Sequence, residues 1–272
     1  MITLTAFTLA GAALAFEPEL PELSPRATAS QQVGITTVEI DWSSPGKRDR
    51  TVWGELVPWG ELWRTGANAA TRLSLEHDAT IGGQPVPAGT YALLTIPGET
   101  EWTVILNKNA GLAGTYGYDE GLDQVRLKVT PEQGPDRERL TFVFSDTDAD
   151  STRLDLEWAG VRVGLPIEVD TPKLVASTVE DYRKGVGGGL ADAARERAQS
   201  GDLDTALALV DASIALGPTW FNTFIKADIL NQQGKHRDAY KLAQEAHAMG
   251  QKTGGYFMKA RVEEALSTWK KR

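Results

Sequence analysis

The 272-residue sequence contains no cysteine and few histidines. The absence of cysteine excludes disulfide bonds, thiol catalysis and cysteine-ligated zinc, so the chain must be held together by its hydrophobic core. The three histidines are His77, His236 and His247, and no two of them have the i, i+4 spacing of a zinc site on a helix. The sequence therefore predicts no metal site and no cofactor.

Several motifs that would identify an enzyme are also missing. There is no G-x-S-x-G nucleophile motif, and Gly187-Gly188-Gly189 is not followed by the Lys-Ser/Thr of a phosphate loop. Residues 146–150 (D-T-D-A-D) lack the later Gly and Glu of a calcium loop, so we interpret them as a solvated turn. A pair of catalytic carboxylates for glycan hydrolysis is kept as an alternative, because several acidic residues lie near aromatic ones in the sequence. These are Glu55, Glu61, Glu99, Glu101, Asp119 and Glu120.

Charge is distributed unevenly along the chain. Residues 17–170 carry 13 Lys and Arg against 25 Asp and Glu, a balance of −12, whereas residues 171–272 carry 15 against 12, a balance of +3. Because phosphate contacts need clustered Lys and Arg, the acidic first part argues against nucleic acid and anionic membranes as partners.

An apolar run occupies the N-terminus and ends in Ala13-Leu14-Ala15. It is too short to span a bilayer, and its small residues fit signal-peptide cleavage after Ala15, although no Lys or Arg precedes the run. We therefore expect residues 1–15 to be a signal peptide and the protein to be exported, to the periplasm or outside the cell. A buried N-terminal strand or helix is the alternative. Residues 16–31, rich in Pro and Glu, are expected to form an extended lead-in.

Between residues 32 and 170 the hydrophobic period is two. Apolar and polar residues alternate in short runs that are separated by Gly- and Pro-rich turns, which is typical of an antiparallel β-sandwich or a jelly-roll-like fold. No helical period lies between the runs, so parallel pairing is not expected. The expected strands lie at 38–42, 72–76, 102–106, 125–129, 140–144, 154–158 and 161–165.

Residues 171–272 change to a helical period, and we expect residues 185–189 (G-V-G-G-G) to break the first helix or to join it to the next. An internal repeat follows: Gly201, Ala206 and Gly217 recur as Gly234, Ala239 and Gly250, each 33 residues later. The pattern resembles tetratricopeptide repeats, although the aromatic positions of that consensus are not filled. We expect a helical-repeat region that packs on the β domain or binds another envelope protein.

The stretch from Trp53 to Thr71 (W-G-E-L-V-P-W-G-E-L-W-R-T-G-A-N-A-A-T) holds three of the eight tryptophans together with Gly, Pro, Arg and Asn. Indole faces suit sugar rings, and an Arg beside them can clamp an anion. The predicted ligand-binding residues are Trp59, Trp63, Arg64, Thr65 and Asn68. In the alternative interpretation the tryptophans fill the core and Arg64 ties the loop together through backbone carbonyls.

This motif, W-G-x-L-V-P-[YW]-G-x-x-W-R-T-G-A-N, resembles a bacterial, mostly exported family known as domain of unknown function 2911. The resemblance also covers P-A-G-T-Y-A-L-L-T-I-P, E-W-T-V-I-L-N and the repeat-like tail, and departs from the family at Ala113 and at Ser43-Ser44. The family carries no known reaction, so the resemblance implies a fold and a shared surface role for the motif, not a mechanism.

The sequence therefore predicts an exported, non-enzymatic binding protein of a mainly β domain and a helical tail. Its ligand would be a sugar-like or anionic small molecule, or an envelope polymer, that contacts the W-R-T-G-A-N loop. One alternative is a glycan-directed hydrolase with a carboxylate pair, and another is a structural protein in which the motif is a buried fold signature. The oligomeric state is left open.

Overall fold

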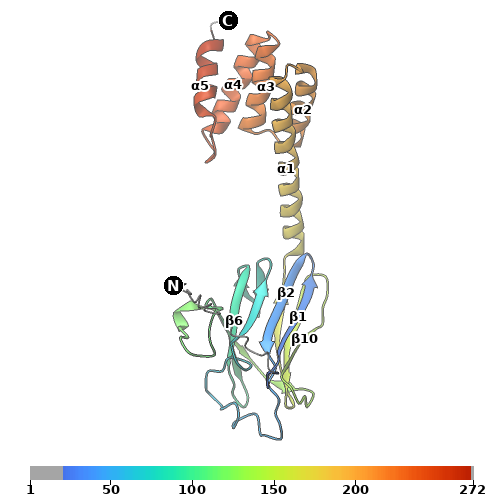
Figure 1. The fold of residues 1–272 in the computed structure, drawn as a ribbon, viewed down its shortest axis with the longest axis vertical. Coiled ribbons are helices and arrows are strands. Elements are labelled where there is room, and N and C mark those ends of the chain that lie inside the picture. The colour runs from blue at the N-terminus through green and yellow to red at the C-terminus, as the bar shows by residue number, and fades with distance from the viewer. Residues whose placement is uncertain (1–20, 271–272) are drawn as a thin grey trace, which may run out of the picture. The chain divides into compact units, whose positions relative to one another are not determined.

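The computed structural model describes residues 21–270, and the predicted signal peptide lies outside them. The chain divides into two compact units between Thr171 and Pro172. In the described residues the first unit contains all the strands and the second contains the long helices (Figure 1). The predicted order, a mainly β domain followed by an α-helical region, is confirmed.

The first unit consists of two antiparallel sheets. One has the strand order β1-β2-β3-β6-β7-β8, and the other has the order β10-β11-β12-β4-β5, with β9 paired to β12. The first sheet contains β1 (Arg26–Val33), β2 (Thr36–Ser43), β3 (Thr71–Leu75), β6 (Gly89–Ile96), β7 (Trp102–Asn107) and β8 (Asp123–Val129). The second contains β10 (Thr141–Ser145), β11 (Ser151–Trp158), β12 (Val161–Glu168), β4 (Ala79–Ile81), β5 (Gln84–Val86) and β9 (Glu132–Gln133).

The main core lies between the two sheets because the apolar residue of each alternating pair turns inward. In β2, Val38 and Ile40 are fully buried while Glu39 is exposed. Trp42 continues this inward face and meets the edge of Phe142 in β10, with ring centroids 5.3 Å apart. Each predicted strand overlaps a strand of the structure.

A second, smaller core covers the outer face of β6 and β7. Ala92, Leu94 and Ile105 point to this face and are covered by Ala70 and Leu112 from two loops. All six residues of β7 are therefore buried. In a sheet with one face in solvent, every second residue of the strand would be exposed. The loop that carries the sequence motif is thus packed against a sheet instead of projecting freely.

The expected lead-in at 16–31 differs from the structure from Arg26 onward. Residues Arg26–Val33 form strand β1, which pairs antiparallel with β2 from Arg26 opposite Ser43 to Val33 opposite Thr36. Its inward positions are mostly small or polar, among them Ala27 and Ala29, so the strand shows little hydrophobic alternation in the sequence. Backbone pairing with β2 holds it in place.

The second unit contains five α-helices: α1 (Thr171–Gln199), α2 (Leu203–Leu216), α3 (Trp220–Gln232), α4 (His236–Gly250) and α5 (Lys259–Trp269). Gly201 and Gly234 have φ of 86° and 80° and make the turns that the sequence predicts between helices. Ala194 and Ala227 are fully buried, which allows neighbouring helices to approach closely. No helix in the described part of the chain is long and apolar enough to cross a membrane.

The prediction of a helix break at residues 185–189 is wrong, because α1 runs through all of them. Gly187 is buried against α2, where a Cβ on it would lie 3.7 Å from the Ser213 carbonyl oxygen. The Ser213 hydroxyl donates a 2.7 Å hydrogen bond to the Gly187 carbonyl. The lack of a side chain at Gly187 therefore serves close packing and does not end the helix.

Candidate functional site

Segment 44–70 connects β2 to β3 and contains the predicted site residues. Its backbone folds back on itself where the Val57 N–H donates to the Val52 carbonyl at 2.8 Å. Residues 52–54 belong to no strand, since Trp53 makes only an isolated bridge with Val57. Glycine and proline in this segment favour a compact irregular loop over a ladder.

The second half of the segment is anchored to β6. Trp63 and Thr95 exchange both backbone hydrogen bonds, at 2.7 and 2.9 Å. The Thr65 side chain is fully buried, and the Thr71 hydroxyl donates a 2.8 Å hydrogen bond to the Thr65 carbonyl. Thr65, a predicted ligand-binding residue, is thus part of the anchor and does not reach the surface.

Five tryptophans form one cluster, three from the loop and two from β7 and β11. Trp53 lies at its centre, with ring centroids within 6.3 Å of those of Trp59, Trp63, Trp102 and Trp158. Trp63 is also stacked on Trp158, at 6.1 Å and an interplanar angle of 21°. Trp102 and Trp158 are almost completely buried. The cluster fixes the position of Trp63 by contact on several sides.

Trp59 and Trp63 have different environments. Trp59 lies over Gly54, where a Cβ would come within 2.7 Å of the Trp59 Nε1. Trp63 donates from Nε1 to the Gly66 carbonyl at 3.1 Å and contributes its partly exposed ring to a cavity. Of the two predicted indoles, only Trp63 lines that cavity.

Arg64 is half-buried and has an unusual lack of partners. Its Nε is buried and makes no hydrogen bond, and no salt bridge joins its guanidinium to a carboxylate among residues 21–270. The side chain passes Gly114, where a Cβ would lie 3.7 Å from the Arg64 Cδ. A buried, unpaired donor on a cation is costly, by about 1–3 kcal/mol or more. The alternative in which Arg64 ties the loop through carbonyls therefore finds no support among these residues.

Asn68 stands at the rim of the same loop and is exposed. Its side-chain amide donates to the Glu22 carboxylate at 3.0 Å, and also lies 3.3 Å from the Ser43 hydroxyl and 3.4 Å from the Ser24 carbonyl. It therefore joins the motif loop to the segment that precedes β1.

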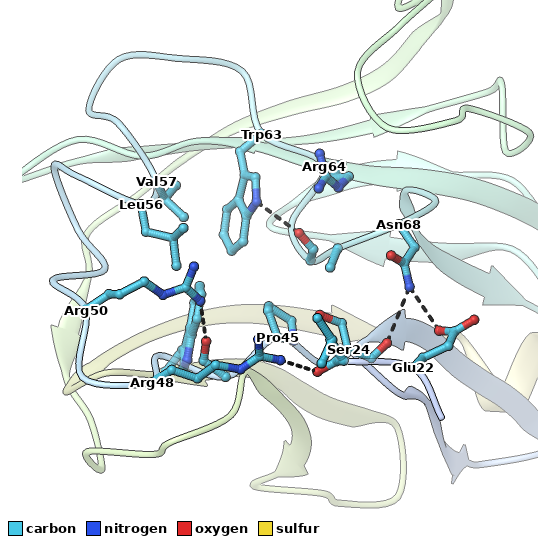
Figure 2. A pocket seen from close by; sticks show the side chains of 15 residues that line it. Glu22, Ser24, Pro45, Arg48, Arg50, Leu56, Val57, Trp63, Arg64 and Asn68 are labelled. Atoms are coloured by element: carbon cyan, nitrogen blue, oxygen red, sulfur yellow. Dashed lines mark hydrogen bonds between the residues drawn. The ribbon is translucent and has the colours of Figure 1, made fainter. Parts of the chain in front are cut away.

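A cavity of about 630 Å³ opens between these elements. Figure 2 shows Arg48 and Arg50 on one side of it, Arg64 and Asn68 on the other, and Trp63 between the two sides. Its volume is within the range of small-molecule sites. The lining residues are Glu22, Leu23, Ser24, Pro45, Gly46, Arg48, Arg50, Leu56, Val57, Trp63, Arg64, Gly66, Ala67, Asn68 and Trp158.

The guanidinium groups of Arg48 and Arg50 donate to backbone carbonyls, while the backbone N–H of Arg48 donates to the Glu138 carboxylate at 2.9 Å. Arg50 donates from Nε to the Lys47 carbonyl at 2.9 Å and from Nη2 to the Gly46 carbonyl at 2.8 Å. Arg48 donates from Nη2 to the Leu23 carbonyl at 2.7 Å. Neither forms a salt bridge with a carboxylate in the described part of the chain. Their guanidinium groups are therefore oriented without a direct carboxylate contact among the described residues.

The neighbouring hollow shows the opposite arrangement. It has a volume of about 200 Å³, and its lining includes Arg26, Asp41 and Arg72. Both arginines donate to the Asp41 carboxylate, and the hydrogen bond from Arg26 is the main reason why the pKa of Asp41 lies below its usual value. Charge is balanced there, whereas none of the three guanidinium groups that line the larger cavity forms a salt bridge among the described residues.

Glu22 is the one carboxylate among the described residues that line the larger cavity. The acidic residues considered for a hydrolase are not in that lining, namely Glu55, Glu61, Glu99, Glu101, Asp119 and Glu120. The acidic turn at 146–150 lies between β10 and β11, also outside the cavity.

Backbone strain gathers around the cavity. Four of the six non-glycine residues with positive φ are Arg48, Asp49, Thr65 and Asn68, with φ of 48°, 57°, 56° and 56°. For a β-branched residue such as Thr65 this conformation is a genuine outlier. Such conformations persist where the surrounding structure imposes them, and they are concentrated at functional sites.

Three of the residues predicted to bind ligand, Trp63, Arg64 and Asn68, line the cavity. Arg48, Arg50 and Glu22 also line it and were not predicted from the sequence. The motif K-R-D-R at 47–50 is the signal that was available, since two arginines flank a turn just before the tryptophan-rich stretch. Read alone, however, a mixed-charge turn is typical of a solvated surface.

The chain was compared with known proteins by family, by sequence and by structure. The model of a family described as a protein of unknown function (DUF2911) matches residues 24–167, which include the whole motif and both sheets except the last residue of β12. The searches of curated proteins and of solved structures found no match.

Proposed function

Since the chain belongs to the DUF2911 family, whose description names no activity, we propose from the cavity itself that it binds a small anionic ligand. Arg64 is the primary contact, Arg48 and Arg50 supply further positive charge, and Trp63 provides an apolar surface. Asn68 sets the rim, while Thr65 holds the loop in place. The carrying observation is the buried Nε of Arg64, which has no partner among residues 21–270.

A bound anion would supply the hydrogen-bond acceptors that Arg64 lacks in the free protein. The buried Nε of Arg64 has no partner among residues 21–270, and the residue as a whole is only half-buried. A carboxylate or phosphate that accepts from the Nη groups of this cation would form charge-assisted hydrogen bonds that the free protein lacks. The planar fork of Arg suits both groups bidentately. The unit that contains the cavity is acidic overall, so three arginines without a salt bridge in one place form a local positive region that an anion can recognise.

We further propose that the protein is exported. The apolar N-terminus with Ala13-Leu14-Ala15 supports secretion or a periplasmic location, in which the protein would meet its ligand outside the cytoplasm. We also propose that the helical unit is a tetratricopeptide-like array that binds an envelope protein. The 33-residue repeat with its positive-φ turns at Gly201 and Gly234 supports this role.

Isothermal titration of the mature chain with citrate and inorganic phosphate at low ionic strength tests anion binding. We expect Arg64→Gln to weaken binding by about tenfold or more, the equivalent of one lost charged hydrogen bond. Lys108→Gln is the matched control, because it removes one positive charge from the same unit at an exposed residue outside the cavity. An equal loss of affinity in the two variants would show that only the net charge of the protein matters, and it would overturn the assignment of Arg64 as the anion contact.

A folding readout accompanies the titration. Because Arg64 makes no hydrogen bond from its buried Nε in the described chain, its replacement is expected to leave the melting temperature unchanged or to raise it. A large fall in melting temperature would instead identify Arg64 as a structural residue.

A further inference from the structure

The lining of the cavity is asymmetric in charge, and this limits which anions fit. Glu22 lies in the lining together with three arginines, yet it pairs with none of them and accepts from the Asn68 amide at 3.0 Å. Figure 2 shows Glu22 next to Asn68, away from Arg50 and Arg48. A ligand charged along its whole length would be repelled at this end, whereas one that presents a hydrogen-bond donor would be accepted.

Part of the cavity lining is apolar. The Nε1 of Trp63 is already used in a hydrogen bond to the Gly66 carbonyl, so the indole offers the ligand its ring and not its donor. Leu56, 38% exposed, and Val57 lie in the same lining. Such a surface fits the C–H face of a ring better than a fully hydrated ion, because desolvating the ion would be costly.

We infer, as an extension of the proposed anion binding, that the ligand is an acidic sugar: a pyranose ring that carries a carboxylate. The carboxylate binds the Arg64 guanidinium, the ring packs on Trp63, and a hydroxyl donates to Glu22. The volume of about 630 Å³ accommodates such a ring with space to spare, so the sugar can be free or the end of a chain.

Two other classes of anion fit less well. A polyphosphate has no apolar face for Trp63 and places negative charge against Glu22. An amino acid can offer its ammonium group to Glu22 and its carboxylate to Arg64, but most of its side chains cannot cover the indole as a ring does. The acidic sugar is the class that satisfies all three parts of the lining.

Isothermal titration with galacturonate, tri-galacturonate, galactose, glutamate, citrate and inorganic phosphate tests the inference. Galacturonate should bind at least about tenfold more tightly than galactose, which lacks the carboxylate, and than glutamate or citrate, which lack the ring. Tri-galacturonate distinguishes the sources: tighter binding than galacturonate indicates a polymer end, and equal or weaker binding indicates the free sugar.

The variants separate the two ends of the site. Glu22→Gln should strengthen citrate binding several-fold by removing a repulsive charge, and should reduce the preference for galacturonate over citrate. Glu61→Gln, an exposed acid in the same loop outside the cavity, is the control and should change neither. Trp63→Phe should weaken galacturonate binding while leaving citrate binding within about twofold.

The outcomes distinguish this inference from the proposed function. Citrate or phosphate binding that depends on Arg64, without a preference for galacturonate, overturns the acidic sugar and leaves the anion site standing. Preference for glutamate over galacturonate likewise overturns it in favour of an amino acid. If none of the six compounds binds in an Arg64-dependent manner, both proposals are wrong.

Discussion

The hydroxyl oxygens of Thr65 and Thr95 lie 3.1 Å apart, and both side chains are almost completely buried. This contact joins the motif loop to β6 at the residue that follows Arg64. Thr65 has a φ of 56°, a conformation that costs a β-branched residue free energy. The side-chain contact therefore helps to hold a strained backbone beside the cavity.

Replacing Thr65 with Val, which keeps the shape and removes the hydroxyl, should lower the free energy of unfolding by about 1–3 kcal/mol because Thr95 loses its buried partner. Thr65→Ser keeps the hydroxyl and should remain within about 1 kcal/mol of the wild type. Urea unfolding followed by tryptophan fluorescence measures both. Equal stability of the two variants would show that the hydroxyl contact contributes little.

Asn68 also has a φ of 56°, but it lies at the exposed rim. Asn68→Ala and Asn68→Gly both remove the hydrogen bonds to Glu22 and Ser24, yet only glycine adopts this backbone conformation without a steric cost. The glycine variant should therefore be more stable than the alanine variant by about 1 kcal/mol. Thermal unfolding of the pair provides the comparison, and the reverse order would contradict the left-handed conformation.

The glycines of α1 provide a test of helix continuity. No neighbouring atom lies within 4 Å of a Cβ built on Gly188 or Gly189, so Gly188→Ala and Gly189→Ala should each raise stability by about 0.5–1 kcal/mol. Gly201→Ala, at a turn with φ of 86°, should lower it by a similar amount. Unfolding monitored by far-UV circular dichroism gives the sign of each change. Destabilisation by all three would indicate that the helix ends near residue 188.

Glu157 should give the first unit an acid-sensitive component of stability. Burial alone would raise its pKa, but hydrogen bonds from Arg162 and Arg137 hold the pKa of Glu157 below its usual value. A lowered folded-state pKa contributes stability that is present above the unfolded pKa of about 4.3 and is lost as pH falls through the folded value.

Glu157→Gln should therefore cost about 2 kcal/mol at neutral pH, the value of hydrogen bonds to charged groups, and should flatten the loss of stability below about pH 4. Urea midpoints measured from about pH 3 to pH 7 check this. A variant whose stability falls as steeply as that of the wild type would assign the acid sensitivity to other carboxylates.

The alternation of apolar and polar residues predicted the positions of seven strands because each presents one face to the main core. The same logic missed β1, whose inward residues Ala27 and Ala29 are too small to give a hydrophobic signal. It also failed for the glycines at 185–189, since local propensity opposes a helix there while packing of Gly187 against Ser213 favours one.

Only some of the residues that line the cavity could be predicted from the sequence. Trp63 and Arg64 belong to one dense motif, so their residue types drew attention directly. Arg48 and Glu22 reach the cavity from elsewhere in the chain, through a positive-φ turn and the segment before β1. Glu22 is brought to the cavity by the pairing of β1 with β2, which places Arg26 opposite Ser43, and no local pattern around Glu22 carries that information.

The arrangement of the five indoles has an optical consequence. Trp53 is nearly perpendicular to Trp63, Trp102 and Trp158, at 79°, 69° and 80°, with centroids 4.9 to 5.9 Å apart. Neighbouring chromophores at this spacing and angle exchange excitation and produce paired bands of opposite sign in circular dichroism. One member of the set, Trp63, borders the cavity. A ligand that packs on Trp63 is therefore expected to change this signal, which would report occupancy of the cavity without a label.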